Sequence, residues 1–143
     1  MAPYELNMNT HMYFGDNCVC EAINKEKNIL GSKVLIVSTG RSLVRLGYID
    51  KLCNYIERDV VVYDKITPNP DVKEIREAIE IGKKNNVTSV IGFGGGSAID
   101  AAKAVAVGIV SEIDIEDFLI QGIEPPNETL PIIAIPTTSG TGA

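Results

Sequence analysis

The chain has 143 residues and a formal net charge of −6, and 45% of its residues are apolar and 22% charged. This length suits one domain with a proper core, and the composition is that of an ordinary globular protein. Scattered basic residues in an acidic chain argue against nucleic-acid binding. No apolar run approaches a membrane span, and the N-terminus lacks a signal pattern. We therefore expect a cytoplasmic protein that binds neither nucleic acid nor membrane.

Three cysteines and one histidine offer little basis for a metal site. Cys18 and Cys20 form a C-x-C pair, but a tetrahedral zinc site needs further ligands, and there is no second cysteine pair and no second histidine. The thiols are interpreted as structural or incidental residues in a reducing compartment. His11 is interpreted as a surface or strand-edge residue, with a ligand or catalytic role as the alternative.

The first part of the chain predicts a short edge strand over residues 12–15 and a helical stretch within residues 16–30. The continuous apolar run of residues 33–39 is typical of a strand that is buried on both faces, as in a parallel sheet covered by helices. A turn is expected at residues 40–42. Apolar residues at helical spacing then follow up to residue 56, with an interruption at Gly47.

A β-rich run at residues 60–63 precedes a Pro- and Asp-containing turn at residues 67–71, which is well suited to opening a helix. The helix after this turn has a clear apolar face and ends at Asn85-Asn86. Residues 89–93 predict the central strand of the sheet.

Residues 97–109 predict a helix of small residues, residues 111–129 an acidic loop, and residues 131–135 a fourth apolar strand. The strands thus begin near residues 34, 60, 89 and 131. Because these are βαβ spacings, we expect an α/β fold, with an open, mostly parallel Rossmann-like sheet and helices on both faces.

Ligands of such sheets bind outside the carboxyl ends of the strands. The conspicuous turns all follow strands: they are residues 39–42, 68–70, 94–97 and 137–142. This clustering predicts a single binding cleft.

The turn Gly94-Gly95-Gly96-Ser97 joins an apolar strand to a helix. Its glycines let an anion approach the backbone, and Ser97 as N-cap would leave free N–H groups facing a phosphate. The alternative is a tight turn that only packs the helix against the sheet. Asp100 either holds a ribose or amide group or only favours the helix N-terminus, and Lys103 is interpreted as a helix-surface cation.

Three ordered motifs resemble those of the iron-containing (group III) alcohol dehydrogenases. They are Pro-Asn-Pro at residues 68–70, the stretch from the glycine turn to Lys103, and Pro-Thr-Thr-Ser-Gly-Thr-Gly at residues 136–142. The likeness covers essentially the whole chain after residue 10. It implies a nicotinamide-cofactor enzyme that interconverts alcohols and aldehydes, built from an N-terminal α/β dinucleotide domain and a C-terminal helical domain.

The resemblance also implies that residues 1–143 are the dinucleotide domain, which is similar to the N-terminal domain of dehydroquinate synthase. Family members hold Fe²⁺ or Zn²⁺ on an Asp and histidines of the second domain, so we expect no catalytic and no metal-binding residue in this chain, and no activity of the chain alone. Association into a homodimer is a further hypothesis. The alternatives are a stand-alone, non-enzymatic nucleotide-binding module and a piece of a glycerol dehydrogenase-like relative.

By the same resemblance, Gly95, Gly96 and Ser97 hold the pyrophosphate of the cofactor, and Asp100 lies near its ribose or nicotinamide. Asn69 lines the cofactor cleft. Contacts with the adenosine and phosphate region are assigned to Thr137, Thr138 and Thr141.

The residue that closes the first strand bears on the choice between NAD and NADP. Family members that prefer NAD often carry an acidic side chain there, which accepts hydrogen bonds from a ribose diol and repels a 2′-phosphate. Here the position is Thr39, followed by Gly40 and Arg41. A neutral residue beside a guanidinium favours a 2′-phosphate, so we expect NADP, with NAD as the alternative.

Overall fold

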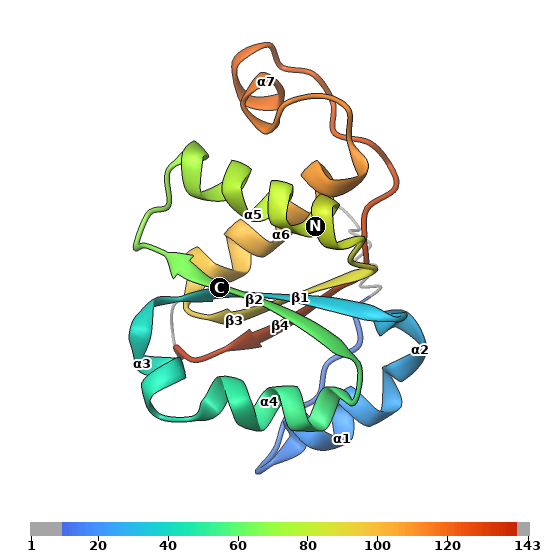
Figure 1. Cartoon of the computed structure of the whole chain (residues 1–143), viewed down its shortest axis with the longest axis vertical. Coiled ribbons are helices and arrows are strands. Elements are labelled where there is room, and N and C mark those ends of the chain that lie inside the picture. The colour runs from blue at the N-terminus through green and yellow to red at the C-terminus, as the bar shows by residue number, and fades with distance from the viewer. Residues whose placement is uncertain (1–9, 140–143) are drawn as a thin grey trace, which may run out of the picture.

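The computed structural model describes residues 10–139, which form a four-stranded parallel sheet with helices on both faces (Figure 1). The strands are β1 (Lys33–Thr39), β2 (Asp59–Ile66), β3 (Ser89–Gly94) and β4 (Ile132–Pro136), in the spatial order β2-β1-β3-β4. The helices are α1 (Cys18–Lys25), α2 (Lys27–Leu30), α3 (Gly40–Arg45), α4 (Tyr48–Ile56), α5 (Val72–Asn85), α6 (Gly96–Val110) and α7 (Ile115–Ile120). The expected open α/β sheet is confirmed. None of the described helices has the length and apolar character that crossing a membrane requires.

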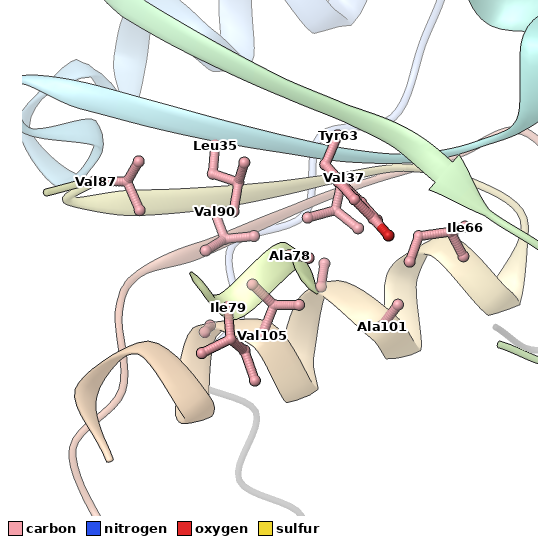
Figure 2. Packing of buried hydrophobic residues seen from close by; sticks show 12 residues of the cluster. Leu35, Val37, Tyr63, Ile66, Ala78, Ile79, Val87, Val90, Ala101 and Val105 are labelled. Atoms are coloured by element: carbon pink, nitrogen blue, oxygen red, sulfur yellow. The ribbon is translucent and has the colours of Figure 1, made fainter. Parts of the chain in front are cut away.

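Alternate residues of β1 belong to two separate hydrophobic cores. Leu35 and Val37 pack with α5 and α6, whereas Val34 and Ile36 pack with α1 and α4. Figure 1 shows these two helix pairs on opposite sides of the sheet, and Figure 2 shows side chains of the first core. Because both faces of β1 and β3 are covered, their sequences are continuous apolar runs rather than alternating ones.

Helix α6 lies unusually close to β3 because small residues line their contact. A Cβ atom added at Gly92 would lie 2.9 Å from the Cβ of Ala102 and 3.2 Å from the Cα of Ile99. The predicted helix of small residues is confirmed, and it extends one residue further at each end than expected.

The edge strand expected at residues 12–15 is wrong, because none of these residues pairs with the sheet. Side chains attach this segment instead. The Tyr13 hydroxyl donates a 2.6 Å hydrogen bond to Oε1 of Glu26, and Nδ1 of the exposed His11 lies 2.9 Å from the same oxygen. Glu26 follows the last residue of α1, so the segment runs along the outside of that helix.

The turn expected at residues 40–42 is also wrong, because α3 begins at Gly40, directly after β1. The break at Gly47 is confirmed, and it divides the predicted helix into α3 and α4.

Strand β2 continues past the predicted end at Tyr63, because its final residue Ile66 pairs with Thr39 at the end of β1.

Residues 111–129, expected as a loop, contain the short helix α7. Asp114 accepts a hydrogen bond from the backbone N–H of Glu116 and so caps this helix. The same carboxylate binds Arg76 of α5 through two hydrogen bonds of 2.7 and 2.8 Å, and Arg76 also donates to Glu116 at 2.6 Å. A tertiary ion pair therefore stabilises a helix too short for propensity to predict.

This ion pair makes the attachment of α7 dependent on pH. The guanidinium of Arg76, with the N–H of Glu116, lowers the pKa of Asp114 to about 2. Since the pKa is lower in the folded state, the stabilisation is present above the ordinary carboxyl pKa near 4 and is lost as the pH falls toward 2. We expect amide protection factors in residues 115–120 to fall over this interval.

The substitution Arg76→Ala is expected to cause the same loss of protection at pH 7, while the central strands keep theirs. Lys73→Ala is the matched control, since Lys73 is an exposed cation on the same helix and forms no ion pair within residues 10–139. Unchanged protection of α7 in Arg76→Ala would show that packing alone holds this helix.

Candidate functional site

The carboxyl ends of the four parallel strands lie at one edge of the sheet, at Thr39, Ile66, Gly94 and Pro136. After β1 the chain adds β2 on one side, and it then adds β3 on the other side of β1. The order of the strands therefore reverses between β1 and β3. Open α/β sheets bind ligands in the crevice at such a switch point.

The glycine turn lies at this switch point. Gly94, the last residue of β3, has a φ of 150°. A Cβ atom there would lie 2.8 Å from Oγ1 of Thr39 and 2.9 Å from the Cβ of Ala98. Both the backbone conformation and the lack of space thus require glycine. Sequence reasoning did not include Gly94 in the site, although its position at the end of a buried strand was a usable signal.

The N-cap of α6 is Gly95, not Ser97 as expected, and no side chain caps this helix. The N–H groups of Ala98 and Ile99 bond to the carbonyl of Gly95, at 3.0 and 3.2 Å. The N-cap of α6 therefore lies two residues before Ser97. The N-terminus of α6, which carries the positive end of the helix dipole and N–H groups without a partner in the helix, therefore lies directly at the glycines 94–96, which have no side chains to cover it.

The loop after β2 reaches the same turn. The backbone N–H of Asn69 donates a 3.2 Å hydrogen bond to Oγ of Ser97 in the first turn of α6. Asn69 is exposed and has a φ of 56°. Two residues 28 positions apart in the sequence, both predicted as site residues, are thus in direct contact.

The segment after β4 lies along the other side of the glycine turn. The N–H of Thr137 donates a 2.9 Å hydrogen bond to the carbonyl of Gly94. A Cβ atom added at Gly95 would lie 3.5 Å from Cγ2 of Thr138, which is ordinary van der Waals contact. Thr137 and Thr138 thus lie beside the turn, whereas Thr141 lies outside the described residues.

The segment after β1 approaches the turn through Thr39, which is partly buried against Gly94. Gly40 and Arg41 open helix α3, and both are exposed. Within residues 10–139, Arg41 forms no ion pair.

The side chain of Asp100, another predicted site residue, forms no hydrogen bond with the turn among the described residues. Its side chain is 75% exposed and bonds to Lys103 at 3.1 Å, as an i,i+3 pair on the surface of α6. An exposed pair of this kind contributes little to stability, so either residue can exchange its partner for a ligand.

The residues of the cluster at the sheet edge are exposed or half-buried, apart from the buried Gly94. Two grooves of about 330 and 240 Å³ lie elsewhere and contain none of the predicted site residues. One lies between the ends of α5 and α6, and the other is lined by α1, α4, Phe93 and Ile135. Within residues 10–139, no group of three His, Cys, Asp or Glu side chains could hold a metal ion.

Comparison with models of protein families shows to which family this chain belongs. The family model described as "Iron-containing alcohol dehydrogenase" matches residues 9–143. The chain belongs to the iron-containing alcohol dehydrogenase family. NADH-dependent butanol dehydrogenase A of Clostridium acetobutylicum is 32% identical over 100% of this chain and 37% of its own length. Alcohol dehydrogenase 4 of Schizosaccharomyces pombe is 34% identical over 91% of this chain and 31% of its own length.

Solved structures of the family have the same fold. NADH-dependent butanol dehydrogenase A from Thermotoga maritima superposes with a TM-score of 0.90, at 33% identity, over 99% of this chain and 36% of that one. Sulfoacetaldehyde reductase from Bifidobacterium kashiwanohense, solved in complex with NAD⁺, gives a TM-score of 0.88 at 31% identity over 99% and 38%. The chain thus spans a little over a third of the length of these relatives.

Substitution by alanine is expected to change the stability of the fold to different extents at two neighbouring glycines of the turn, Gly94 and Gly95. Gly94→Ala forces a Cβ against Thr39 and Ala98 at a φ that alanine disfavours, and it should destabilise the fold by about 1–3 kcal/mol. Gly95→Ala has an ordinary φ of −78°, and its Cβ would meet Thr138 only at van der Waals distance, so it should lose less, at most about 1 kcal/mol from placing alanine at the N-cap of α6. Urea denaturation followed by circular dichroism measures both, and equal midpoints would contradict the packing described for Gly94.

Proposed function

We propose that residues 1–143 are the dinucleotide-binding domain of an NAD(P)-dependent, iron-containing alcohol dehydrogenase. The observation that carries this proposal is the convergence of the segments at the ends of β1, β2 and β4 on the glycine turn that follows β3, at the β1/β3 switch point. A pyrophosphate suits this place, because the turn lets an anion approach the backbone and the α6 N-terminus supplies N–H donors.

Different residues of the cluster are proposed to contact different parts of the cofactor. Gly95, Gly96 and Ser97 hold the pyrophosphate, and Asn69 borders the cleft from the β2 side. On the β4 side, Thr137 and Thr138 border the adenosine and phosphate region, together with Thr141. Asp100 is proposed to lie toward the ribose or nicotinamide, where a ligand hydroxyl or amide would replace Lys103 as its partner.

NADP is the proposed form of the cofactor. Thr39 brings no negative charge to the end of β1, and Arg41, two residues further on in the first turn of α3, is exposed and forms no ion pair within residues 10–139. A guanidinium matches the planar, bidentate recognition of phosphate, whereas an acidic side chain would repel a 2′-phosphate. Two relatives are named as NADH-dependent, which makes a direct comparison of the two cofactors the decisive experiment.

The substitution Arg41→Ala tests this choice. We expect wild-type protein to bind NADPH more tightly than NADH, and the variant to lose about tenfold in NADPH affinity through loss of one charge-assisted phosphate contact. Affinity for NADH should stay the same. Isothermal titration measures all four constants.

Arg45→Ala is the matched control, because Arg45 is exposed on the same helix and removes the same charge. It should leave NADPH affinity within about twofold of the wild type, since only long-range attraction is lost. Tighter binding of NADH than of NADPH by the wild type would overturn the NADP assignment and leave the dinucleotide site in place.

The alcohol chemistry is proposed for a longer polypeptide that contains this chain and a metal-binding helical domain, acting in the cytoplasm. In that enzyme the metal polarises the substrate oxygen, and this chain contributes the bound nicotinamide. The assigned metal ligands lie outside residues 1–143. The purified 143-residue chain is therefore expected to bind the nucleotide and to show no alcohol oxidation with added Fe²⁺ or Zn²⁺.

An absorbance assay at the nicotinamide band, run with butanol and 1,3-propanediol, measures this directly. The control is the same assay on the longer polypeptide. Turnover by the 143-residue chain would contradict the proposal that this chain only binds the cofactor and that the metal-binding domain is needed for alcohol oxidation. Nucleotide binding with no turnover by either form would favour a non-enzymatic nucleotide-binding module.

A further inference from the structure

The loop from Thr67 to Asp71, between β2 and α5, is held at one end by a residue outside the proposed cofactor site and in its middle by Ser97, a residue of that site. Pro68 and Pro70 have no backbone N–H, so the segment 67–70 has only two backbone donors, at Thr67 and Asn69. Both donors are bonded to side chains of neighbouring helices. The conformation of this loop therefore depends on two acceptors, one in α5 and one in α6.

The acceptor in α5 is Glu74. Its Oε2 accepts the N–H of Thr67 at 3.0 Å, and its Oε1 accepts the hydroxyl of the same residue at 2.7 Å. In return, the N–H of Glu74 donates to Oδ1 of Asp71, the N-cap of α5, at 3.0 Å. This resembles a capping box in which the glutamate reaches past the N-cap to the start of the loop. We call these three hydrogen bonds the Thr67–Glu74 clamp.

Between the two ends that the clamp joins, Asn69 has a φ of 56°. Asparagine adopts this left-handed conformation more readily than other residues with a side chain, so the local sequence already favours it and the clamp has only to select it. On either side, proline rings restrict the backbone, and the N–H of Asn69 is directed to Oγ of Ser97. The clamp thus fixes the two ends of a short loop whose middle residue touches the glycine turn.

We propose that Glu74 is a positioning residue of the dinucleotide site, which acts through Thr67 to hold Asn69 against Ser97 at the edge of the cofactor cleft. The proposal rests on the proposed function and adds to it a residue that has no contact with the cofactor itself. Without the clamp, the loop exchanges among several conformations, and only the clamped one presents Asn69 to the ligand.

The expected loss of nucleotide affinity follows from the fraction of molecules in which the loop 67–71 has the clamped conformation. If the clamped form falls from nearly all molecules to about a fifth of them, the apparent dissociation constant rises about fivefold. Electrostatics predicts the opposite sign. Removing the negative charge of Glu74 near a site for an anionic ligand should tighten binding, so a loss of affinity in Glu74→Ala cannot arise from the change in charge.

The experiment is isothermal titration of NADPH and NADH into the wild type and into Glu74→Ala, Thr67→Val and Thr67→Ser, with the thermal midpoint of each protein measured in parallel. We expect Glu74→Ala to bind both nucleotides about fivefold more weakly, Thr67→Val to show a smaller loss, and Thr67→Ser to restore wild-type affinity. The double variant Thr67→Val/Glu74→Ala should be no weaker than Glu74→Ala, since both substitutions break the same clamp.

The matched control is Glu80→Ala, because Glu80 is an exposed carboxylate on the same helix and forms no ion pair within residues 10–139. It should bind as tightly as the wild type or slightly more tightly. If Glu74→Ala fails to fold, the Thr67→Val and Thr67→Ser pair decides the question, because neither substitution alters α5.

Two outcomes overturn the inference in distinguishable ways. A wild type that binds the nucleotides, with Glu74→Ala and Thr67→Val binding equally well or better, overturns the role of Glu74 alone. A wild type that binds neither nucleotide overturns the proposed function, and the positioning role with it.

Discussion

The close approach of α6 to the sheet is the constraint on which the rest of this structure depends. Gly92 leaves room for Ala102, and Gly94 leaves room for Ala98, so the helix rests almost directly on β3. On its other side, α6 interlocks with α5, because Ile79 packs onto Gly108 and Ile109 packs onto Gly82. These contacts leave α6 little freedom to slide or rotate, since interiors are packed as densely as organic crystals.

This packing determines where the N-terminus of α6 lies. With the helix held against β3, its first turn must begin at the carboxyl edge of the sheet, beside the ends of β1 and β4. The loop after β2 then reaches this point because α5, which follows it, is interlocked with α6. Packing of apolar residues and glycines thus positions polar groups that lie on the surface, and the Thr67–Glu74 clamp refines the position of one of them.

In the proposed function, this chain contributes one wall of a cofactor cleft. Its proposed role is to bind and orient a dinucleotide, a task that needs backbone donors, hydroxyls and a guanidinium but no perturbed acid or base. The relatives, of which this chain spans about a third, are named for alcohol oxidoreduction as whole proteins. The proposed division between a cofactor domain and a metal domain is consistent with the lack of a metal-ligand cluster among the described residues.

Local patterns predicted much of the fold correctly. Continuous apolar runs identified β1, β3 and β4, the Asp71 cap and apolar face identified α5, and the order of the turns located the candidate site. Patterns failed where the deciding contact was distant in the sequence. Helix α7 depends on Arg76, some forty residues away, and the end of β2 depends on pairing with β1.

The sequence by itself determined which residue types gather at the carboxyl edge of the sheet, because βαβ spacing and glycine content are local properties. Only the tertiary structure decided which of them touch. The α6 N-terminus lies at Gly95 rather than Ser97, so Ser97 is free to accept the N–H of Asn69 instead of capping its own helix. At Gly94 there is no room for a side chain, because Thr39 and Ala98, from two other elements, occupy the space that it would need.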